Sequence, residues 1–331
     1  MLALVLVLLA AASDEALRAG LIALQKGDLA AAQARLETAS RESPRDGRVW
    51  VALSQTYWRL HREADAEAAA TKAADVAPND PAVLQGLAIY YSETGRTLKA
   101  AQAEAGFAAK MPGNGAARAR AAELYFAAAK PLLDGQKFAE AAAVLEEATA
   151  RVKGDAQLEL ALGVAYYGLR RFDEAADAFL STIDVAPETP QPYTFLGKIL
   201  DQIPSRLPKV TEKFAAYEAA HPERAEAWLL HAKAVDAQSG EAAEALRLAE
   251  KAIALGAGAD AWFEKGAALD RLGRFADAAA AFEAAARMAP DDAATHYRLA
   301  RDYERIGKRE EAKRERERHA ELVKKEEGKR E

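Results

Sequence analysis

The sequence predicts an all-α solenoid of about nine helix–turn–helix repeats. Alanines recur at intervals of 34 residues, first at Ala32, Ala66 and Ala100 and again at Ala278 and Ala312. Several prolines and two tryptophans keep nearly the same interval. Half of the residues are hydrophobic, 7% are aromatic and 29% are charged, which is typical of a helix-rich chain rather than a disordered segment or a membrane bundle. Repeats of this length stack on their neighbours to bury one continuous core.

Composition also excludes several classes of function. The chain has no cysteine, so disulfide scaffolds, thiolate zinc sites and iron–sulfur sites are excluded. Lys and Arg number 45 against 51 Asp and Glu, and the net charge of −6 is spread along the chain. A nucleic-acid-binding protein carries a concentrated basic patch, so we expect no nucleic-acid partner.

The N-terminal segment 1–13 is interpreted as a signal peptide. The apolar run from Leu2 to Ala12 is too short for the roughly 20 residues that span a bilayer, so no integral membrane span is expected. Ala11 and Ser13 are small residues at the spacing of a cleavage site before Asp14. An apolar first helix is the alternative, because only the α-amino group of Met1 supplies positive charge ahead of the run. We therefore expect a periplasmic or secreted protein, and a cytoplasmic one if the run is not cleaved.

Within one repeat the residues form a helical stripe. Trp50, Leu53, Ser54 and Tyr57 lie at i, i+3, i+4 and i+7, so they share one face of a helix. Small residues on the second helix let its neighbour approach closely, and a proline such as Pro78 then ends that helix. Such a hairpin cannot bury its stripe alone and must stack.

The phase of these positions divides the solenoid, residues 14–326, into nine units. Seven extra residues around 115–121 precede the fourth unit, and Pro204 and Pro208 predict a longer turn in the sixth. The seventh unit lacks a terminating proline. The units are 13–46, 47–80, 81–114, 122–155, 156–189, 190–224, 225–258, 259–292 and 293–326.

The C-terminal segment 308–331 differs in character. It holds ten basic and eight acidic residues at alternating helical positions, with Glu310 and Arg314 four residues apart. We interpret it as a charged helix and tail that cap the last unit, because terminal repeats need a polar outer face. A charged docking site is the alternative.

The repeated phrases resemble the tetratricopeptide repeat family. The unit 259–292 carries its pattern most fully, with Trp262, Gly266, Ala278, Phe282 and Pro290. The resemblance covers nearly the whole chain and implies a right-handed superhelix whose first helices line a concave groove. Proteins of this family bind protein or peptide segments, so the implied partner is an amphipathic helix or an extended segment. The family's carboxylate clamp is not expected, because Asn79 and Asn114 are the only asparagines and both lie in turns between units.

The resemblance also implies which residues face the groove. They lie beside the packing stripe, rotated around the first helix, and are mostly apolar with interspersed basic side chains. The alternative for the aliphatic members is contact with the preceding unit, which would make them core residues. The implied groove residues are Val51, Gln55, Trp58, Arg59, Ile89, Phe126, Lys130, Leu160, Val164, Tyr167, Lys198, Leu229, Lys233, Phe263 and Tyr297.

No catalytic pattern emerges from the sequence. The five histidines form no HExxH motif and no close pair, so no metal site is expected. Gly256, Gly258 and Ala261 spell GxGxxA but follow a helical stretch rather than a strand, so no dinucleotide cofactor is expected. The sequence therefore predicts a non-enzymatic scaffold or adaptor. An accessory or regulatory subunit of an envelope enzyme or of an assembly or secretion machine is the alternative.

Overall fold

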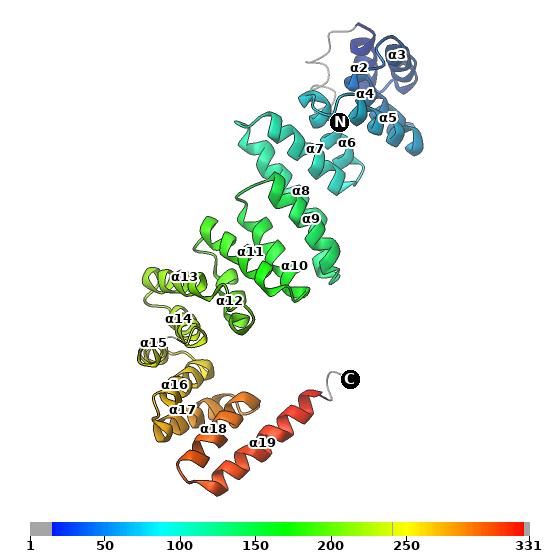
Figure 1. The fold of residues 1–331 in the computed structure, drawn as a ribbon. Helices are drawn as coiled ribbons and strands as arrows, with labels where there is room; N and C mark the ends of the chain where they lie inside the picture. The colour runs from blue at the N-terminus through cyan, green and yellow to red at the C-terminus, as the bar shows by residue number, and fades with distance from the viewer. Residues whose placement is uncertain (1–14, 240, 328–331) are drawn as a thin grey trace. The chain divides into compact units, whose positions relative to one another are not determined.

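The computed structural model describes residues 15–239 and 241–327, and these form helices without any strand (Figure 1). They divide into two compact units, residues 1–170 and 171–331. The expected signal peptide, residues 1–13, and the end of the tail lie outside the described residues. Even-numbered labels mark the first helices of the repeats and odd-numbered labels the second helices.

In unit 1 the helices follow one another with short turns. They are α2 (Glu15–Lys26), α3 (Leu29–Glu42), α4 (Gly47–Arg59), α5 (Glu63–Val76), α6 (Pro81–Glu93), α7 (Thr97–Lys110), α8 (Gly115–Asp134), α9 (Phe138–Arg151) and α10 (Ala156–Gly168).

Unit 2 continues the pattern and contains one short 3₁₀ helix, η1. Its elements are α11 (Phe172–Val185), α12 (Pro190–Lys198), η1 (Leu200–Gln202), α13 (Leu207–Ala220), α14 (Ala225–Ala237), α15 (Ala242–Ala254), α16 (Ala259–Arg271), α17 (Phe275–Met288), α18 (Ala293–Arg305) and α19 (Arg309–Glu327).

Small side chains stand where the helices of a repeat meet. The eighth residue of every unit is Gly, Ser or Ala, and an ideal Cβ at Gly266 would lie 2.7 Å from the Phe282 ring. Ala32, Ala66 and Ala278 on the second helices are fully buried. The residues at the eighth position are Gly20, Ser54, Ala88, Ala129, Gly163, Gly197, Ala232, Gly266 and Ala300.

Eight of the nine described turns from a first to a second helix contain a residue in the left-handed region. In the second repeat this residue is His61, with φ of 59°. The His61 amide donates to the Trp58 carbonyl, and the Arg62 amide donates to the Tyr57 carbonyl at 2.9 Å. These two hydrogen bonds satisfy carbonyl groups at the C-terminal end of α4. The sixth repeat differs, because η1 and Pro204 lengthen its turn. The other positions are Gly27, Gly95, Gln136, Arg170, Ser239, Gly273 and Gly307.

Polar contacts join each repeat to the one before it. Trp50 Nε1 donates to the Pro44 carbonyl at 2.9 Å, and Trp228 Nε1 donates to the Pro222 carbonyl at 3.0 Å. The carbonyl oxygen at a helix-ending proline is thereby satisfied by the next first helix. Tyr303 Oη donates to the Glu283 carboxylate twenty residues earlier, at 2.6 Å. The pairs Tyr57–Glu37 and Tyr166–Glu146 repeat that contact in unit 1.

Helix lengths follow the irregularities of the sequence. Helix α8 has 20 residues where a regular first helix has 13, so the seven extra residues extend it by two turns. Pro131 lies in its last turn. Helix α12 has only nine residues, and η1 completes that segment before Ile203 and Pro204. The sixth unit therefore ends its α-helix at Lys198, earlier than the proline at 204 alone predicts.

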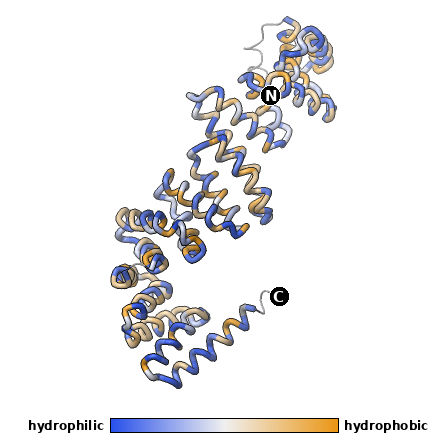
Figure 2. Tube along the Cα trace, viewed as in Figure 1, coloured by the Kyte–Doolittle hydropathy of each residue, from blue (hydrophilic) through white to orange (hydrophobic). Residues whose placement is uncertain are grey.

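The last helix, α19, is mostly hydrophilic (Figure 2). Its Ala312 and Leu322 are buried, and Arg318 pairs with Asp291 at 2.8 Å. His296 of α18 contacts the Glu315 carboxylate through Nδ1 at 2.5 Å and the Pro290 carbonyl through Nε2 at 3.0 Å. One side of α19 thus covers α18, and the other carries charge.

Close packing at the eighth position makes a direct prediction for Gly266→Ala. The added methyl group meets the Phe282 ring, so we expect a loss of about 1–3 kcal/mol in the free energy of unfolding. Hydrogen exchange of the α16 and α17 amides measures it. Gly115→Ala is the control, because no atom lies within 4 Å of its added methyl group and alanine favours a helix, so α8 should gain stability slightly. Equal effects of the two substitutions would contradict the packing argument.

A buried carboxyl group affects stability differently. Asp302 of α18 is 1% exposed and contacts the Arg305 guanidinium at 3.3 Å. Burial, followed by the neighbouring Asp270 carboxylate, raises the pKa of Asp302 from 3.8 to about 6, although Arg305 opposes this rise. The folded chain therefore holds this proton more tightly than the unfolded chain does. Stability falls as pH rises from about 4 to about 6, because ionising Asp302 is harder in the fold.

We expect Asp302→Asn to raise the free energy of unfolding at pH 7 by about 1–3 kcal/mol, since the amide does not ionise. The gain should shrink to below about 1 kcal/mol at pH 4, where the folded chain keeps the proton and almost half of the unfolded chains carry it as well. Urea unfolding at the two pH values measures the difference. Asp277→Asn, at an exposed residue that pairs with Arg274, serves as the control and should change stability little. A gain that is the same at pH 4 and pH 7 would exclude the ionisation argument.

Candidate binding groove

Two of the implied groove residues belong to the core of unit 1. Val51 is fully buried and Gln55 is 2% exposed. Gln55 Nε2 donates to the Glu93 carboxylate at 2.9 Å, which ties α4 to the next first helix, α6. Both positions face neighbouring helices, so the groove assignment is corrected here: Val51 and Gln55 are packing residues.

Trp58, Arg59 and Ile89 also contribute to packing. Arg59 Nη1 donates to the Leu24 carbonyl at 3.1 Å and so caps the C-terminal end of α2. Trp58 and Ile89 are half-buried against the same core cluster, and the Arg96 guanidinium lies 5.8 Å from the centre of the Trp58 ring. These side chains present only part of their surface to a partner.

The remaining members in unit 1 are half-buried, except for one. Lys130 is exposed and pairs with Asp134 on its own helix at 2.6 Å. An exposed pair of this kind is worth little to stability, and its charges are available to a partner. The half-buried members are Phe126, Leu160, Val164 and Tyr167.

In unit 2 the structure brings several members together. Lys198 lies at the end of α12, Lys233 on α14 and Phe263 on α16, and all three line adjoining cavities. Tyr297 on α18 is 48% exposed and Leu229 is half-buried, and neither lines these two cavities. We call the hollow formed by the two cavities the α12–α18 groove.

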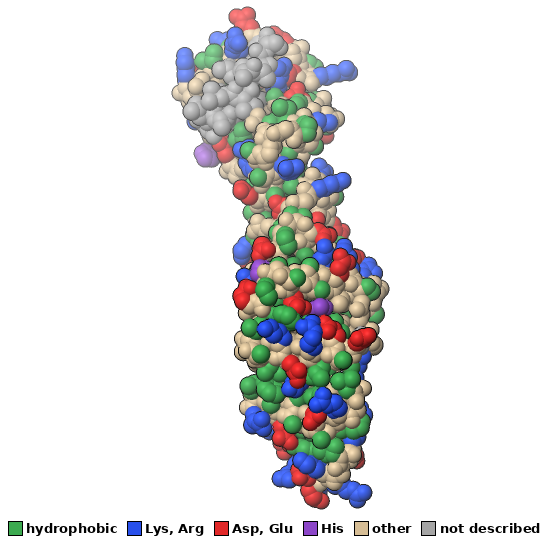
Figure 3. Space-filling view, turned by 90° about the vertical axis from the view of Figure 1, so that its left-hand side faces the viewer, with side chains coloured by type: hydrophobic (Ala, Val, Ile, Leu, Met, Phe, Trp, Pro, Cys, Tyr) green, Lys and Arg blue, Asp and Glu red, His purple; other side chains and the backbone are tan. Residues whose placement is uncertain are grey.

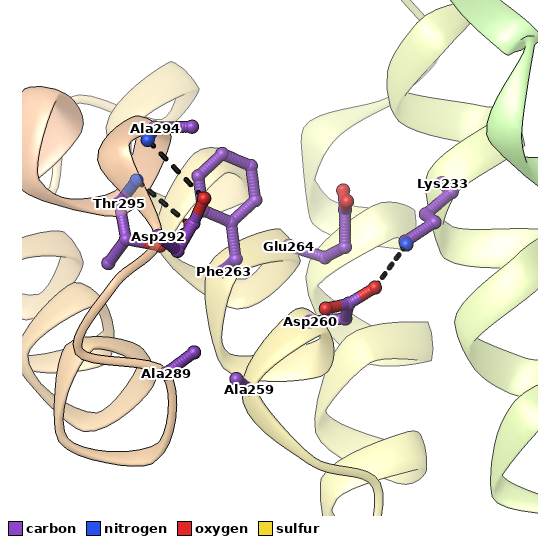
Figure 4. Close-up of a pocket in the computed structure, with 9 residues that line it drawn as sticks. All are labelled: Lys233, Ala259, Asp260, Phe263, Glu264, Ala289, Asp292, Ala294 and Thr295. Atoms are coloured by element: carbon purple, nitrogen blue, oxygen red, sulfur yellow. Dashed lines mark hydrogen bonds and ion pairs between the residues drawn. The ribbon is translucent and has the colours of Figure 1, made fainter. Parts of the chain in front are cut away.

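The first cavity has a volume of about 240 Å³ and lies between α14, α16 and the start of α18 (Figure 4). The second, of about 310 Å³, extends toward α12 and shares Lys233, Phe263 and Glu264 with the first. Ala259, Ala289 and Ala294 leave the first cavity open because their side chains are small. Figure 3 shows charged side chains of both signs interspersed with apolar ones on one face of the molecule.

Most charges around the groove are paired. Lys233 Nζ lies 2.6 Å from Asp260, and Arg271 lies 2.8 Å from Asp236. Asp292 accepts hydrogen bonds from the amides of Ala294 and Thr295 and so caps α18 (Figure 4). These pairs hold the first helices in register along the groove.

Glu264 is an exception. Its carboxyl group lines both cavities, and no hydrogen bond or ion pair to it is found among the described residues. Burial is the main reason that the pKa of Glu264 is raised from 4.5 to about 7; Lys233 opposes the rise, and the carboxylates of Asp236, Asp260 and Asp201 add to it. The group is thus poised to change its charge near neutral pH.

Sequence reasoning named Lys198, Lys233 and Phe263 among the residues that line the cavities, and missed Arg298 and the acidic ones. Asp201, Asp236, Asp260 and Glu264 were not among the expected residues. One signal was available: Glu264 and Arg298 occupy the same position of consecutive repeats, 34 residues apart, next to the expected Phe263 and Tyr297.

The described residues contain no group of three or more histidine, aspartate or glutamate side chains that could hold a metal ion. Among the helices of the described part of the chain, none is long and apolar enough to cross a membrane.

Comparison with known proteins finds curated relatives of partial length. The peroxisomal targeting signal receptor of Komagataella phaffii is 28% identical over 176 residues, which cover 50% of this chain and 29% of the receptor. The receptor of Komagataella pastoris matches equally. The chain thus spans less than a third of the length of these relatives.

Similar solved structures are also helical repeat proteins with low identity. Yeast Tom70 is 15% identical with a TM-score of 0.44, covering 92% of this chain and 83% of that one. MamA from Desulfovibrio magneticus is 19% identical with a TM-score of 0.38, covering 62% of this chain and 96% of that one.

Family models provide the assignment. Tetratricopeptide repeat models match residues 23–90, 132–199 and 259–292, together about half of the chain. Their matches fall on helices with the 34-residue period, the small eighth residue and the turns described above. The chain belongs to the tetratricopeptide repeat family.

Proposed function

We propose that this protein is a non-enzymatic scaffold or adaptor that binds a segment of a partner protein in the α12–α18 groove. The observation that supports it is the open pair of cavities on consecutive first helices, where apolar Phe263 stands beside charged Lys198, Lys233 and Glu264. Such a mixture suits a segment that anchors side chains in pockets and is oriented by charge. The repeat family and a relative named as a receptor for a targeting signal agree with this role.

We further propose that the protein works in the cell envelope, as a periplasmic or secreted protein. This rests on the apolar run from Leu2 to Ala12 and the small residues Ala11 and Ser13 after it. An adaptor in that compartment meets envelope proteins as partners. If the partner is an enzyme or an assembly machine, the protein is its accessory subunit.

Site-specific cross-linking tests the groove. With the photoreactive residue p-benzoylphenylalanine at position 198, where the exposed side chain of Lys198 lines the second cavity, we expect a defined cross-linked partner. Met288 is the control, because it is an exposed residue at the end of a helix in unit 2 and lines neither cavity. Cross-linking to the same partner at both positions, or only at Met288, would place the binding surface elsewhere. Mass spectrometry of the product identifies the partner and decides between adaptor and accessory subunit.

N-terminal sequencing of the protein from its native cells tests the location. We expect the mature chain to begin at Ser13 or Asp14, because cleavage follows the small residues that end the apolar run. Recovery of the chain with Met1 intact from a cytosolic fraction would contradict the envelope proposal while leaving the groove proposal in place.

A further inference from the structure

The most enclosed carboxylate of the α12–α18 groove has no hydrogen bond or ion pair among the described residues. This is Glu264 of α16, which lines both cavities and which Figure 4 shows beside the Lys233–Asp260 pair, with no hydrogen bond or ion pair to the other residues drawn. Glu264 is half-buried, and a carboxylate that is partly removed from water is costly unless a cation or hydrogen-bond donor reaches it. The described residues form no ion pair with Glu264, so its counter-charge is left for a bound partner to supply.

The neighbouring cations are already engaged. Lys233 holds Asp260 at 2.6 Å, and Arg298 lies 3.7 Å from Asp270, which also contacts Arg305. Lys198 is exposed at the end of α12, with its ammonium 5.6 Å from the centre of the Phe195 ring. None of the three forms an ion pair with Glu264.

Carboxylates outnumber cations along the lining. The two cavities are lined by five acidic side chains and three basic ones. Asp201, on η1, is exposed and forms no ion pair among the described residues, so a second negative charge is open at the α12 end. An incoming cation is favoured here over an incoming anion. The acidic residues are Asp201, Asp236, Asp260, Glu264 and Asp292, and the basic residues are Lys198, Lys233 and Arg298.

An apolar wall adjoins the carboxylate. Phe263 precedes Glu264 in the chain, lines both cavities, and is fixed by an edge-to-face contact with Phe282 at 5.4 Å between ring centres. Long basic side chains bury their alkyl stems on apolar surface while their charged ends reach a polar group. Phe263 and the alanines around it supply such a surface next to Glu264.

We propose that the groove takes a lysine or arginine side chain of the bound segment, with its stem against Phe263 and its cation at the Glu264 carboxylate. The inference rests on the proposed function and specifies its partner: a segment with a basic residue among apolar ones. Charge complementarity of this kind contributes to specificity, because a segment with an acidic residue at that point would meet an excess of carboxylates.

The interaction depends on pH. The groups that face Glu264 are Lys233 and Asp236 on α14, Asp260 on α16 and Asp201 on η1, with Lys198 and Arg298 at the far cavity. Because the pKa of Glu264 is about 7, the carboxyl group is mostly neutral at pH 6 and mostly ionised at pH 8. A cation prefers the ionised form, so binding strengthens by about tenfold over this range and releases a proton.

Selection from a phage-displayed library of short random peptides tests the proposal on the full chain at pH 8. Competition with the cross-link from position 198, which lines the second cavity, identifies peptides that occupy the groove. We expect these peptides to share a lysine or arginine. Glu264→Gln, or replacement of that basic residue by norleucine, should weaken binding at least about tenfold, and the two changes together should cost little more. Glu212→Gln is the control, because Glu212 is an exposed carboxylate on α13 that lines neither cavity.

The outcomes separate the two proposals. This inference would be overturned, with the groove kept as the binding site, if the groove-binding peptides lacked a basic residue. The same holds if the peptides bound through acidic residues that contact Lys198 and Lys233. Unchanged affinity in Glu264→Gln, or the same affinity at pH 6 and pH 8, would also overturn it. If no selected peptide competes for the groove, the proposed function fails as well.

Discussion

The close approach of two helices in every repeat is the constraint on which the rest of the structure depends. A glycine, serine or alanine at the eighth position of the repeat, on the first helix, allows it, and fully buried alanines such as Ala66 and Ala278 on the second helix complete it. Because the contact recurs every 34 residues, each hairpin presents the same faces to its neighbours. The tyrosine–glutamate and tryptophan–carbonyl contacts then fix the next hairpin at a constant register.

The same packing determines where a partner can be held. One face of each first helix packs against the second helix of the same repeat. The residues beside that face contact either a neighbouring helix or solvent. In unit 1 such residues contact neighbouring helices, since Val51 and Gln55 are buried and Arg59 caps α2. In unit 2 alanines line the corresponding space, so cavities remain beside Phe263. Repeats of one family can thus share a backbone and differ in whether their inner face is closed.

Much of the fold could be predicted from the period, because small residues and helix-ending prolines act locally. The left-handed residues His61, Gln136, Arg170 and Ser239 could not, since they are not glycines like Gly27, Gly95, Gly273 and Gly307 and only the spacing marks them. The groove was harder to predict. Whether Val51 faces a helix or a partner depends on neighbours that lie outside its own repeat, and the charge of Glu264 depends on Asp201, Asp236 and Asp260 from three separate elements. The period of a sequence predicts which residues share a helix face. It does not predict which residues of other repeats that face will contact.

The contacts between repeats have a consequence for how the chain is made. Tyr303 reaches back twenty residues to Glu283, and Gln55 reaches forward thirty-eight to Glu93, so a hairpin finds its partners within the next or the preceding repeat. A segment leaving the ribosome can therefore complete one layer of core before the following repeats have been synthesised. Folding can keep pace with elongation, and the unfinished end exposes only the face that the next repeat will cover.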